Sequence, residues 1–250
     1  MLGLCVQTFS LPKQGYQPEE YEDAWAHTAA RLALADGASD AFESRLWAQA
    51  LVQAFIHQPP ELHRAALLDW LATPIQVWKE GIHWQQLPWY AEEKARRGAF
   101  ATLLGVTFAW PATDGTGEAD ATAPWAALAV GDVCLFQIRA EEVIVHFPVQ
   151  RAVDFGTTPP LLSSRLDYNR RSLEALRTCT GESWPGDLFV LATDALAAWF
   201  LRQVEAGARP WQCLIDLTAD TFAALVTSLR HEGVMRNDDV TLVLAADTRG

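Results

Sequence analysis

The pattern of apolar and polar positions along the chain predicts a mixture of strands and helices. Short apolar runs bounded by turn residues predict strands over the ranges 4–10, 31–35, 99–109, 125–130, 133–138, 142–147, 187–193 and 239–245. The central runs, between residues 99 and 147, follow one another with only turn signals between them. This arrangement is typical of antiparallel strands.

Apolar residues at helical spacing predict helices between those strands. The helical ranges are 41–56, 61–79 with an interruption at Pro74, 89–97, 169–178, 195–205 and 211–230. Ser39 or Asp40 is expected to cap the first of these helices, and Pro59-Pro60 ends it. Strands and helices intermixed in this order predict an α+β fold with layered sheets, in a single domain over residues 1–250.

Composition and charge narrow the possible functions. Half of the 250 residues are hydrophobic, which is enough for a sizeable core. The formal net charge of −12 argues against nucleic acid as a partner, because phosphate backbones bind basic surfaces. The four cysteines are scattered without Cys-x-x-Cys spacing, so we expect neither a zinc site nor a disulfide framework.

The amino-terminal residues 1–5 lack the basic start and long apolar core of a signal peptide. No apolar run reaches the ~18 residues that a membrane helix needs. We therefore expect a cytoplasmic protein without a membrane partner. Several tryptophans gather in one helical region, at Trp70, Trp78, Trp84 and Trp89. Core packing is their expected role, and an exposed partner-binding face is the alternative.

Four aspartates stand at the ends of strand-like runs or in short acidic motifs beside them: Asp23, Asp36, Asp194 and Asp238. A carboxylate at such a position is costly to bury unless a cation or hydrogen-bond donor pairs with it. Several carboxylates that converge from distant parts of the chain would form an oxygen-rich site for a hard divalent cation. The sequence therefore offers a candidate metal site.

Each aspartate also has an ordinary interpretation when it is taken alone. Glu22-Asp23 fits an acidic helix start, Asp36-Gly37 fits a turn, and Asp194 fits a helix cap. Asp238-Asp239 fits a loop before a strand, and Asp132 fits a hairpin turn better than a metal ligand. Only the ordered set of aspartates favours metal binding.

Five segments in order resemble motifs of the metal-dependent protein serine/threonine phosphatases of type 2C. They are "YEDAW" (21–25), "LALADGAS" (32–39), "WAALAVGDVCLF" (125–136), "DLFVLATDALAAWF" (187–200) and "RNDDVTLVLA" (236–245). The resemblance runs nearly end to end. It implies a four-layer α-β-β-α sandwich, in which two central antiparallel sheets are flanked by helices.

The resemblance also implies a site and a reaction. Asp36 would bridge two Mg²⁺ or Mn²⁺ ions, and the Gly37 carbonyl would bind one of them. Asp194 and Asp238 would complete the shell of the second ion. Asp23 would act directly or through a metal-bound water, with Glu22 as its neighbour. Hydrolysis of phosphoserine or phosphothreonine in a phosphoprotein substrate, made by a serine/threonine kinase, would use a water activated by the two metals and no side-chain nucleophile.

The chain departs from the family pattern where the substrate is handled. The arginine usual before the acidic pair is replaced by a stretch around Gln17, and Lys13 is the nearest cation that would substitute for it. Ala38 and Ala198 replace a usual histidine and a usual acidic residue. A catalytically weak or inactive type 2C-like regulatory module is therefore the alternative. A nuclease or cyclic-nucleotide esterase is disfavoured, because the acidic chain has no basic groove signal.

Overall fold

A computed structural model of the chain describes residues 3–110 and 122–248, and two antiparallel sheets form its centre. Sheet I has the strand order β1 (Leu4–Leu11), β12 (Val240–Asp247), β11 (Leu188–Ala192), β7 (Cys134–Arg139) and β8 (Glu142–Phe147). Sheet II has the order β10 (Arg177–Ser183), β6 (Ala123–Val130), β5 (Leu103–Phe108), β3 (Arg31–Ala35) and β2 (Ala24–Thr28). A short pair, β4 (Phe100–Ala101) with β9 (Leu162–Ser163), lies beside them.

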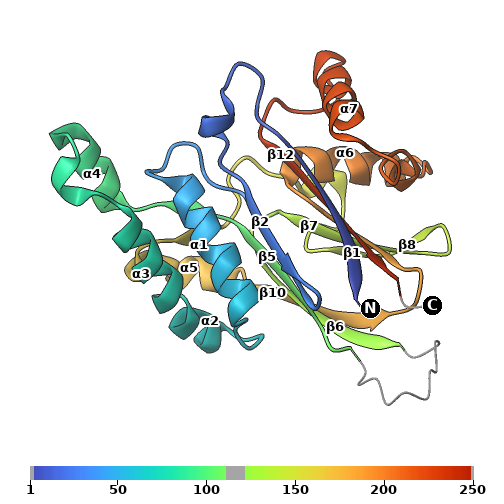
Figure 1. The fold of residues 1–250 in the computed structure, drawn as a ribbon, viewed down its shortest axis with the longest axis horizontal. Coiled ribbons are helices and arrows are strands. Elements are labelled where there is room, and N and C mark those ends of the chain that lie inside the picture. The colour runs from blue at the N-terminus through green and yellow to red at the C-terminus, as the bar shows by residue number, and fades with distance from the viewer. Residues whose placement is uncertain (1–2, 111–121, 249–250) are drawn as a thin grey trace.

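Helices cover the outer faces of both sheets (Figure 1). On the side of sheet II lie α1 (Ser44–His57), α2 (Arg64–Trp70), α3 (Ala72–Gly81), α4 (Trp89–Arg97) and α5 (Asn169–Glu174). On the side of sheet I lie α6 (Asp194–Glu205) and α7 (Ala219–His231). Short 3-10 turns are η1 (Pro18–Glu20), η2 (Trp84–Gln86), η3 (Ala152–Asp154), η4 (Leu166–Tyr168) and η5 (Pro210–Cys213).

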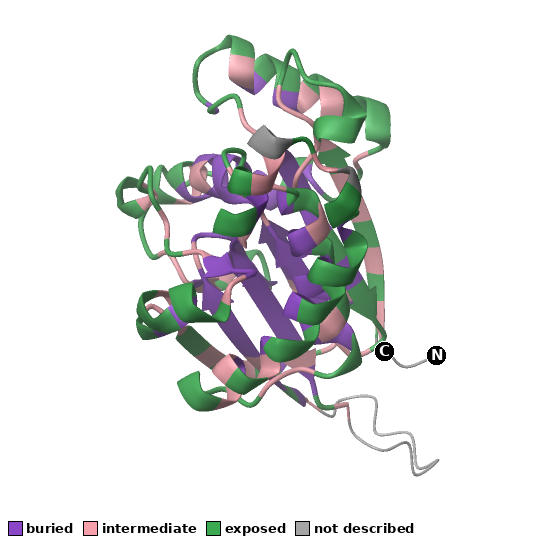
Figure 2. Cartoon of the chain, turned by 90° about the vertical axis from the view of Figure 1, so that its left-hand side faces the viewer, coloured by how far each residue is buried: buried purple, intermediate pink, exposed green. Residues whose placement is uncertain are grey.

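The central strands are mostly apolar because both of their faces are buried. In β3, Leu32 and Leu34 join the core between the two sheets, whereas Ala33 and Ala35 face the α1 side. Successive side chains of a strand point to opposite faces, so one run of apolar residues supplies two cores. Figure 2 shows the buried strands at the centre of the molecule.

Three apolar cores follow from this alternation. One lies between sheet II and helices α1–α3, one between the sheets, and one between sheet I and helices α6 and α7. Three cores separate four layers, so the predicted α-β-β-α sandwich is confirmed.

The close approach of α1 to sheet II depends on a glycine. A Cβ added to Gly105 in β5 would lie 2.3 Å from the ring of Phe55, which is buried in α1. Only a residue without a side chain leaves room for that ring. The close packing of α1 on sheet II therefore requires glycine at position 105.

Several element boundaries differ from the sequence prediction. The first helix begins after Glu43 and not after Ser39 or Asp40, and the break between α2 and α3 falls at Leu71. Pro74 lies within the first turn of α3, where a proline is tolerated. The predicted helix over 169–178 ends at Glu174.

Three strands were not predicted at all, namely β2, β9 and β10. The acidic pair Glu22-Asp23 therefore precedes a strand, so its interpretation as a helix start is wrong. Most of the predicted hairpin loop 111–124 lies outside the described residues. Among the described helices, none has the length and apolar character needed to cross a bilayer.

Candidate metal centre

The strand-end aspartates meet at one end of the two sheets. Asp23 precedes β2 and Asp36 follows β3, and these antiparallel strands pair Ala24 with Ala35, so the two carboxylates flank the same ladder. Asp194 comes two residues after the end of β11, and Asp238 comes two residues before the start of β12. Because β11 and β12 are antiparallel neighbours, Asp194 and Asp238 also share one end. The topology thus brings the carboxylates together as two pairs, one at an end of each sheet.

A threonine connects the two sheets at this point. The Thr241 hydroxyl in β12 of sheet I donates to Oδ2 of Asp23 in sheet II over 2.7 Å. The Tyr21 hydroxyl contacts the same threonine and lies 3.3 Å from Asp23 Oδ2. The Thr241 backbone N–H donates to the Thr193 hydroxyl over 2.9 Å, next to Asp194. Asp23 is therefore held in a fixed position.

Four buried aspartate oxygens in this region lack a hydrogen-bond partner within the described residues: Oδ1 of Asp23, Oδ1 of Asp194 and both oxygens of Asp132. These residues are only 4%, 7% and 6% exposed. A buried oxygen without a donor costs about 1–3 kcal/mol, and more when it is charged. Such oxygens are what a divalent cation would satisfy.

Mutual repulsion and burial make these carboxyl groups hard to ionise. Burial raises the pKa of Asp23 to about 7; the hydrogen bond from Thr241 opposes this rise, and repulsion from Asp239 and Asp238 adds to it. Burial also raises the pKa of Asp36 well above its usual value, followed by repulsion from Asp23 and Asp132. A nearby cation would lower these pKa values again.

Asp132 joins the cluster although its sequence context favoured an isolated hairpin turn. It lies between β6 of sheet II and β7 of sheet I, at the crossing from one sheet to the other. Burial raises the pKa of Asp132 to about 6, the Arg236 guanidinium opposes that rise, and Asp238 adds to it. The sequence interpretation missed this contribution to the site.

Arg236 supplies positive charge to the cluster. Its guanidinium forms an ion pair and hydrogen bond with Oδ2 of Asp194 and lies 3.3 Å from Oδ2 of Asp238. Asp194 is the first residue of α6, but Thr193 occupies the cap position, so the interpretation of Asp194 as a helix cap is wrong. The arginine side chain is about half exposed, so it is free to leave the carboxylates.

The loop before the acidic pair folds back onto the site. Lys13 Nζ lies 3.6 Å from Glu22 Oε2 and donates to the Ser39 hydroxyl over 2.8 Å. Glu22 Oε1 accepts a hydrogen bond of 2.8 Å from Ser44 at the start of α1. The Asp239 carboxylate accepts the backbone N–H groups of Lys13 and Glu22 over 2.9 and 2.8 Å. Asp239 therefore fastens this loop to β12.

Gly37 has no space for a side chain. A Cβ at this position would lie 2.7 Å from the Glu22 carbonyl oxygen and 3.0 Å from Cβ of Ser44. Gly37 also pairs with Ala101 in an isolated bridge. The backbone around its carbonyl is thus fixed between the acidic pair and α1.

The donor set suits Mg²⁺ or Mn²⁺, since both favour carboxylate and carbonyl oxygens. In the described ranges 3–110 and 122–248, however, no three acidic, histidine or cysteine side chains converge closely enough to hold an ion without adjustment. The pairing of Asp194 with Arg236 is one reason. Metal binding would require that pair to open, and the roles assigned to Asp23, Asp36, Gly37, Asp194 and Asp238 remain predictions.

The chain was compared with known families, sequences and solved structures. No family profile and no curated protein sequence matches the chain. Among solved structures, the Mycobacterium tuberculosis serine/threonine phosphatase PstP is similar at 20% identity and a TM-score of 0.59, covering 98% of this chain and 99% of that one. The chain has the fold of a type 2C-like phosphatase.

Two further structures share this type 2C-like fold. The catalytic domain of PstP in complex with two manganese ions matches at 19% identity and a TM-score of 0.61, with 98% and 99% of the two chains covered. The PPM Ser-Thr phosphatase MsPP from Mycobacterium smegmatis, in complex with cacodylate, matches at 16% identity and a TM-score of 0.53, with the same coverage. The resemblance drawn from the five motifs is confirmed at the level of the fold.

Proposed function

We propose that this protein is a Mg²⁺- or Mn²⁺-dependent phosphatase that hydrolyses phosphoserine or phosphothreonine in protein substrates. The observation that carries the proposal is the set of buried aspartate oxygens without hydrogen-bond donors at the meeting point of the two sheets. The shared fold supports it, because the similar structures are serine/threonine phosphatases and one of them holds two manganese ions.

Asp36 and the Gly37 carbonyl would hold one ion, and Asp36 with Asp194 and Asp238 would hold a second. Asp23 would complete the site directly or through water. Two divalent ions supply charge neutralisation for the phosphoryl oxygens and an acidified water. No side-chain nucleophile is proposed.

Two cations of the chain are positioned to bind the phosphoryl group of the substrate. Lys13 Nζ lies at the rim beside Glu22, and Arg236 contacts Asp194 and Asp238. With those aspartates engaged by metal, the Arg236 guanidinium would be free to form charge-assisted hydrogen bonds to phosphate. Arg236 would then replace the arginine that is missing before the acidic pair.

The proposed substrates are proteins phosphorylated by a serine/threonine kinase, and the proposed place of action is the cytoplasm. Support for the substrate class comes from the phosphatases that share the fold.

Hydrolysis of an aryl phosphate tests the proposal. We expect activity with Mn²⁺, loss of activity in EDTA, and a drop of roughly a hundredfold or more in kcat for Asp36→Asn and Asp194→Asn, because a metal site contributes several kcal/mol to transition-state stabilisation. Asp154→Asn, which changes an exposed carboxylate paired with Arg151, is the matched control and should retain activity. Full activity in EDTA, or in both site variants, would falsify the proposal.

The second candidate function is a catalytically weak or inactive regulatory module that retains the fold. The ion pair between Arg236 and Asp194 favours it, since this pair competes with metal binding. Calorimetric titration with Mn²⁺ separates the two functions when it is combined with turnover. Metal binding without turnover of any phosphopeptide supports the module, whereas metal-dependent turnover excludes it.

A further inference from the structure

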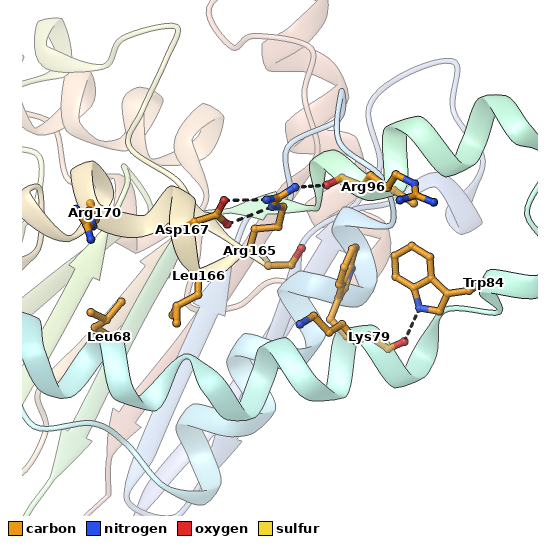
Figure 3. Close-up of a pocket in the computed structure, with 11 residues that line it drawn as sticks. Leu68, Lys79, Trp84, Arg96, Arg165, Leu166, Asp167 and Arg170 are labelled. Atoms are coloured by element: carbon orange, nitrogen blue, oxygen red, sulfur yellow. Dashed lines mark hydrogen bonds and ion pairs between the residues drawn. The ribbon is translucent and has the colours of Figure 1, made fainter.

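One cavity of the described structure lies away from the carboxylate cluster. It has a volume of about 740 Å³ and opens between α2–α3, α4 and the η4–α5 segment (Figure 3). This volume is within the range of about 300–1,000 Å³ that is typical of ligand pockets. Nothing in the proposed phosphatase chemistry uses it.

The lining of this cavity combines an apolar floor with a basic rim. The floor includes Leu68, Trp78 and Leu166, and Leu166 is 48% exposed. Trp84 forms an edge of the floor, with its ring 6.2 Å from that of Trp78 in a T-shaped arrangement. Its indole N–H donates to the Lys79 carbonyl over 3.0 Å, so the ring is held against the end of α3.

Four cationic side chains face one carboxylate around the cavity: Lys79, Arg96, Arg165 and Arg170 against Asp167. This is a strong local excess of positive charge in a chain with a net charge of −12. Within the described residues, neither Lys79 nor Arg170 has an ion-pair partner. These two charges are therefore available to an external anion.

Arg165 has a different role, because it joins the walls of the cavity. Its guanidinium donates to both oxygens of Asp167 over 3.2 and 2.8 Å and to the Arg96 carbonyl at the end of α4 over 2.8 Å. It also lies 4.6 Å from the ring of Tyr168. The rim is thus held in place before any ligand arrives.

Paired strands connect the cavity to the segment that carries Asp36 and Gly37. Gly37 pairs with Ala101, Ala101 pairs with Leu162, and Ser164 of the cavity follows two residues later. Two strand spacings of about 4.8 Å and an extension of two residues place Gly37 and Ser164 roughly 15 Å apart. An extended peptide covers this distance in about four or five residues.

We infer that this cavity binds an acidic segment with a bulky apolar side chain, located about four or five residues from the phosphorylated residue of the protein substrate. The inference rests on the proposed phosphatase function. Lys79 and Arg170 would bind the carboxylates, and the floor of Leu68, Trp84 and Leu166 would bury the apolar side chain. Clusters of basic residues recognise acidic motifs in this way.

Binding is measured by fluorescence polarisation in EDTA, so that it does not depend on turnover. The probe is a fluorescein-labelled peptide with phosphoserine followed by Asp-Leu-Asp-Glu, at spacings of two to eight residues. In EDTA the cavity alone is tested, so we expect replacement of the acidic residues by lysine to abolish binding. The preference for a spacing of four or five residues should appear in the KM values measured with Mn²⁺, when the phosphoserine also binds. Equal binding of the acidic and lysine peptides overturns the inference.

The charge-reversal variant Lys79→Glu/Arg170→Glu should weaken binding at least tenfold. The control Arg151→Glu/Arg177→Glu makes the same change in net charge at exposed positions outside the cavity and should stay within twofold of the wild type. Leu166→Ala should weaken binding several-fold without any change in charge. Unchanged binding in the first variant contradicts the inference.

Kinetics with Mn²⁺ separate this inference from the proposed function. The charge-reversal variant should raise KM for the best phosphopeptide about tenfold, with kcat for that peptide and hydrolysis of an aryl phosphate unchanged. If the charge-reversal variant hydrolyses aryl phosphate normally and its KM for the peptide is unchanged, the proposed role of the cavity is overturned, but the phosphatase function is not. Absence of any hydrolysis by the wild type overturns the phosphatase function, while peptide binding in EDTA still reports on the cavity.

Discussion

The Asp132 side chain is buried, and neither of its carboxylate oxygens has a hydrogen-bond partner within the described residues. Its pKa is raised to about 6, chiefly by burial. The folded protein therefore holds a proton that the unfolded chain releases near pH 4. The folding stability that this proton contributes is present below about pH 4 and is lost as the pH rises to about 6.

Asp132→Asn should remove this dependence on pH. In EDTA, the free energy of unfolding of the wild type should fall, relative to that of the variant, by on the order of 2 kcal/mol between pH 4 and pH 7. Urea denaturation at several pH values measures it, with Asp154→Asn as the exposed control. If the free energy of unfolding changed with pH in the same way in the wild type and in Asp132→Asn, ionisation of Asp132 would not destabilise the folded protein.

Individual site residues were predictable only where a strand end marked them. Asp36 and Asp194 follow apolar runs in the sequence, so the sequence marked both as candidate ligands. Asp132 and Arg236 lie in connections whose direction depends on how the sheets pack, and no local pattern reports that direction. Asp239 was noted only as part of a loop, although its carboxylate holds two distant backbone N–H groups.

At the scale of elements, the central strands and both edge strands of sheet I were recognised, whereas the two edge strands of sheet II were not. The strand β2 alternates buried and exposed residues, and β10 buries only Ser183 among its seven residues. Both lie at the edges of sheet II, where polar residues limit association with other chains. Their weak apolar signal is therefore a consequence of position, and only the assembled sheet reveals them.

The contact of α1 with β5 gives a prediction at the scale of elements. Gly105→Ala should destabilise the protein by about 1–3 kcal/mol, because the added methyl group overlaps the Phe55 ring. Adding Phe55→Leu should recover part of the loss, since a smaller side chain leaves room for the methyl group. Urea denaturation of both single variants and the double variant measures the coupling.

Gly156→Ala is the matched control for this substitution, since its Cβ would have only the Thr158 backbone nitrogen nearby, at 4.0 Å. It should change the stability by less than about 0.5 kcal/mol. Equal effects of the two glycine substitutions would mean that α1 moves away from the sheet at little cost.

At the scale of the whole molecule, the candidate metal centre joins two sheets that otherwise meet through an apolar core. Asp23 and Asp36 come from sheet II, whereas Asp194 and Asp238 come from sheet I. Ions that bound both pairs would stabilise the packing of one sheet on the other. Within the described residues, Arg236 is the only cation paired with the side-chain carboxylates of Asp194 and Asp238. We therefore expect the proposed metal and the arginine to compete for these carboxylates.

Arg236→Met should reveal this competition in thermal unfolding. The metal-free variant should melt at a lower temperature than the wild type, because the aspartates lose a partner and repel one another. Mn²⁺ at about 100 times its Kd should stabilise the wild type by about 2.7 kcal/mol, and the variant should show a larger rise in Tm because no arginine must be displaced. Arg151→Met, which breaks the exposed pair with Asp154, is the control and should leave both values unchanged. A higher metal-free Tm for Arg236→Met, or a smaller rise with Mn²⁺, would mean that the arginine and the metal do not share these ligands.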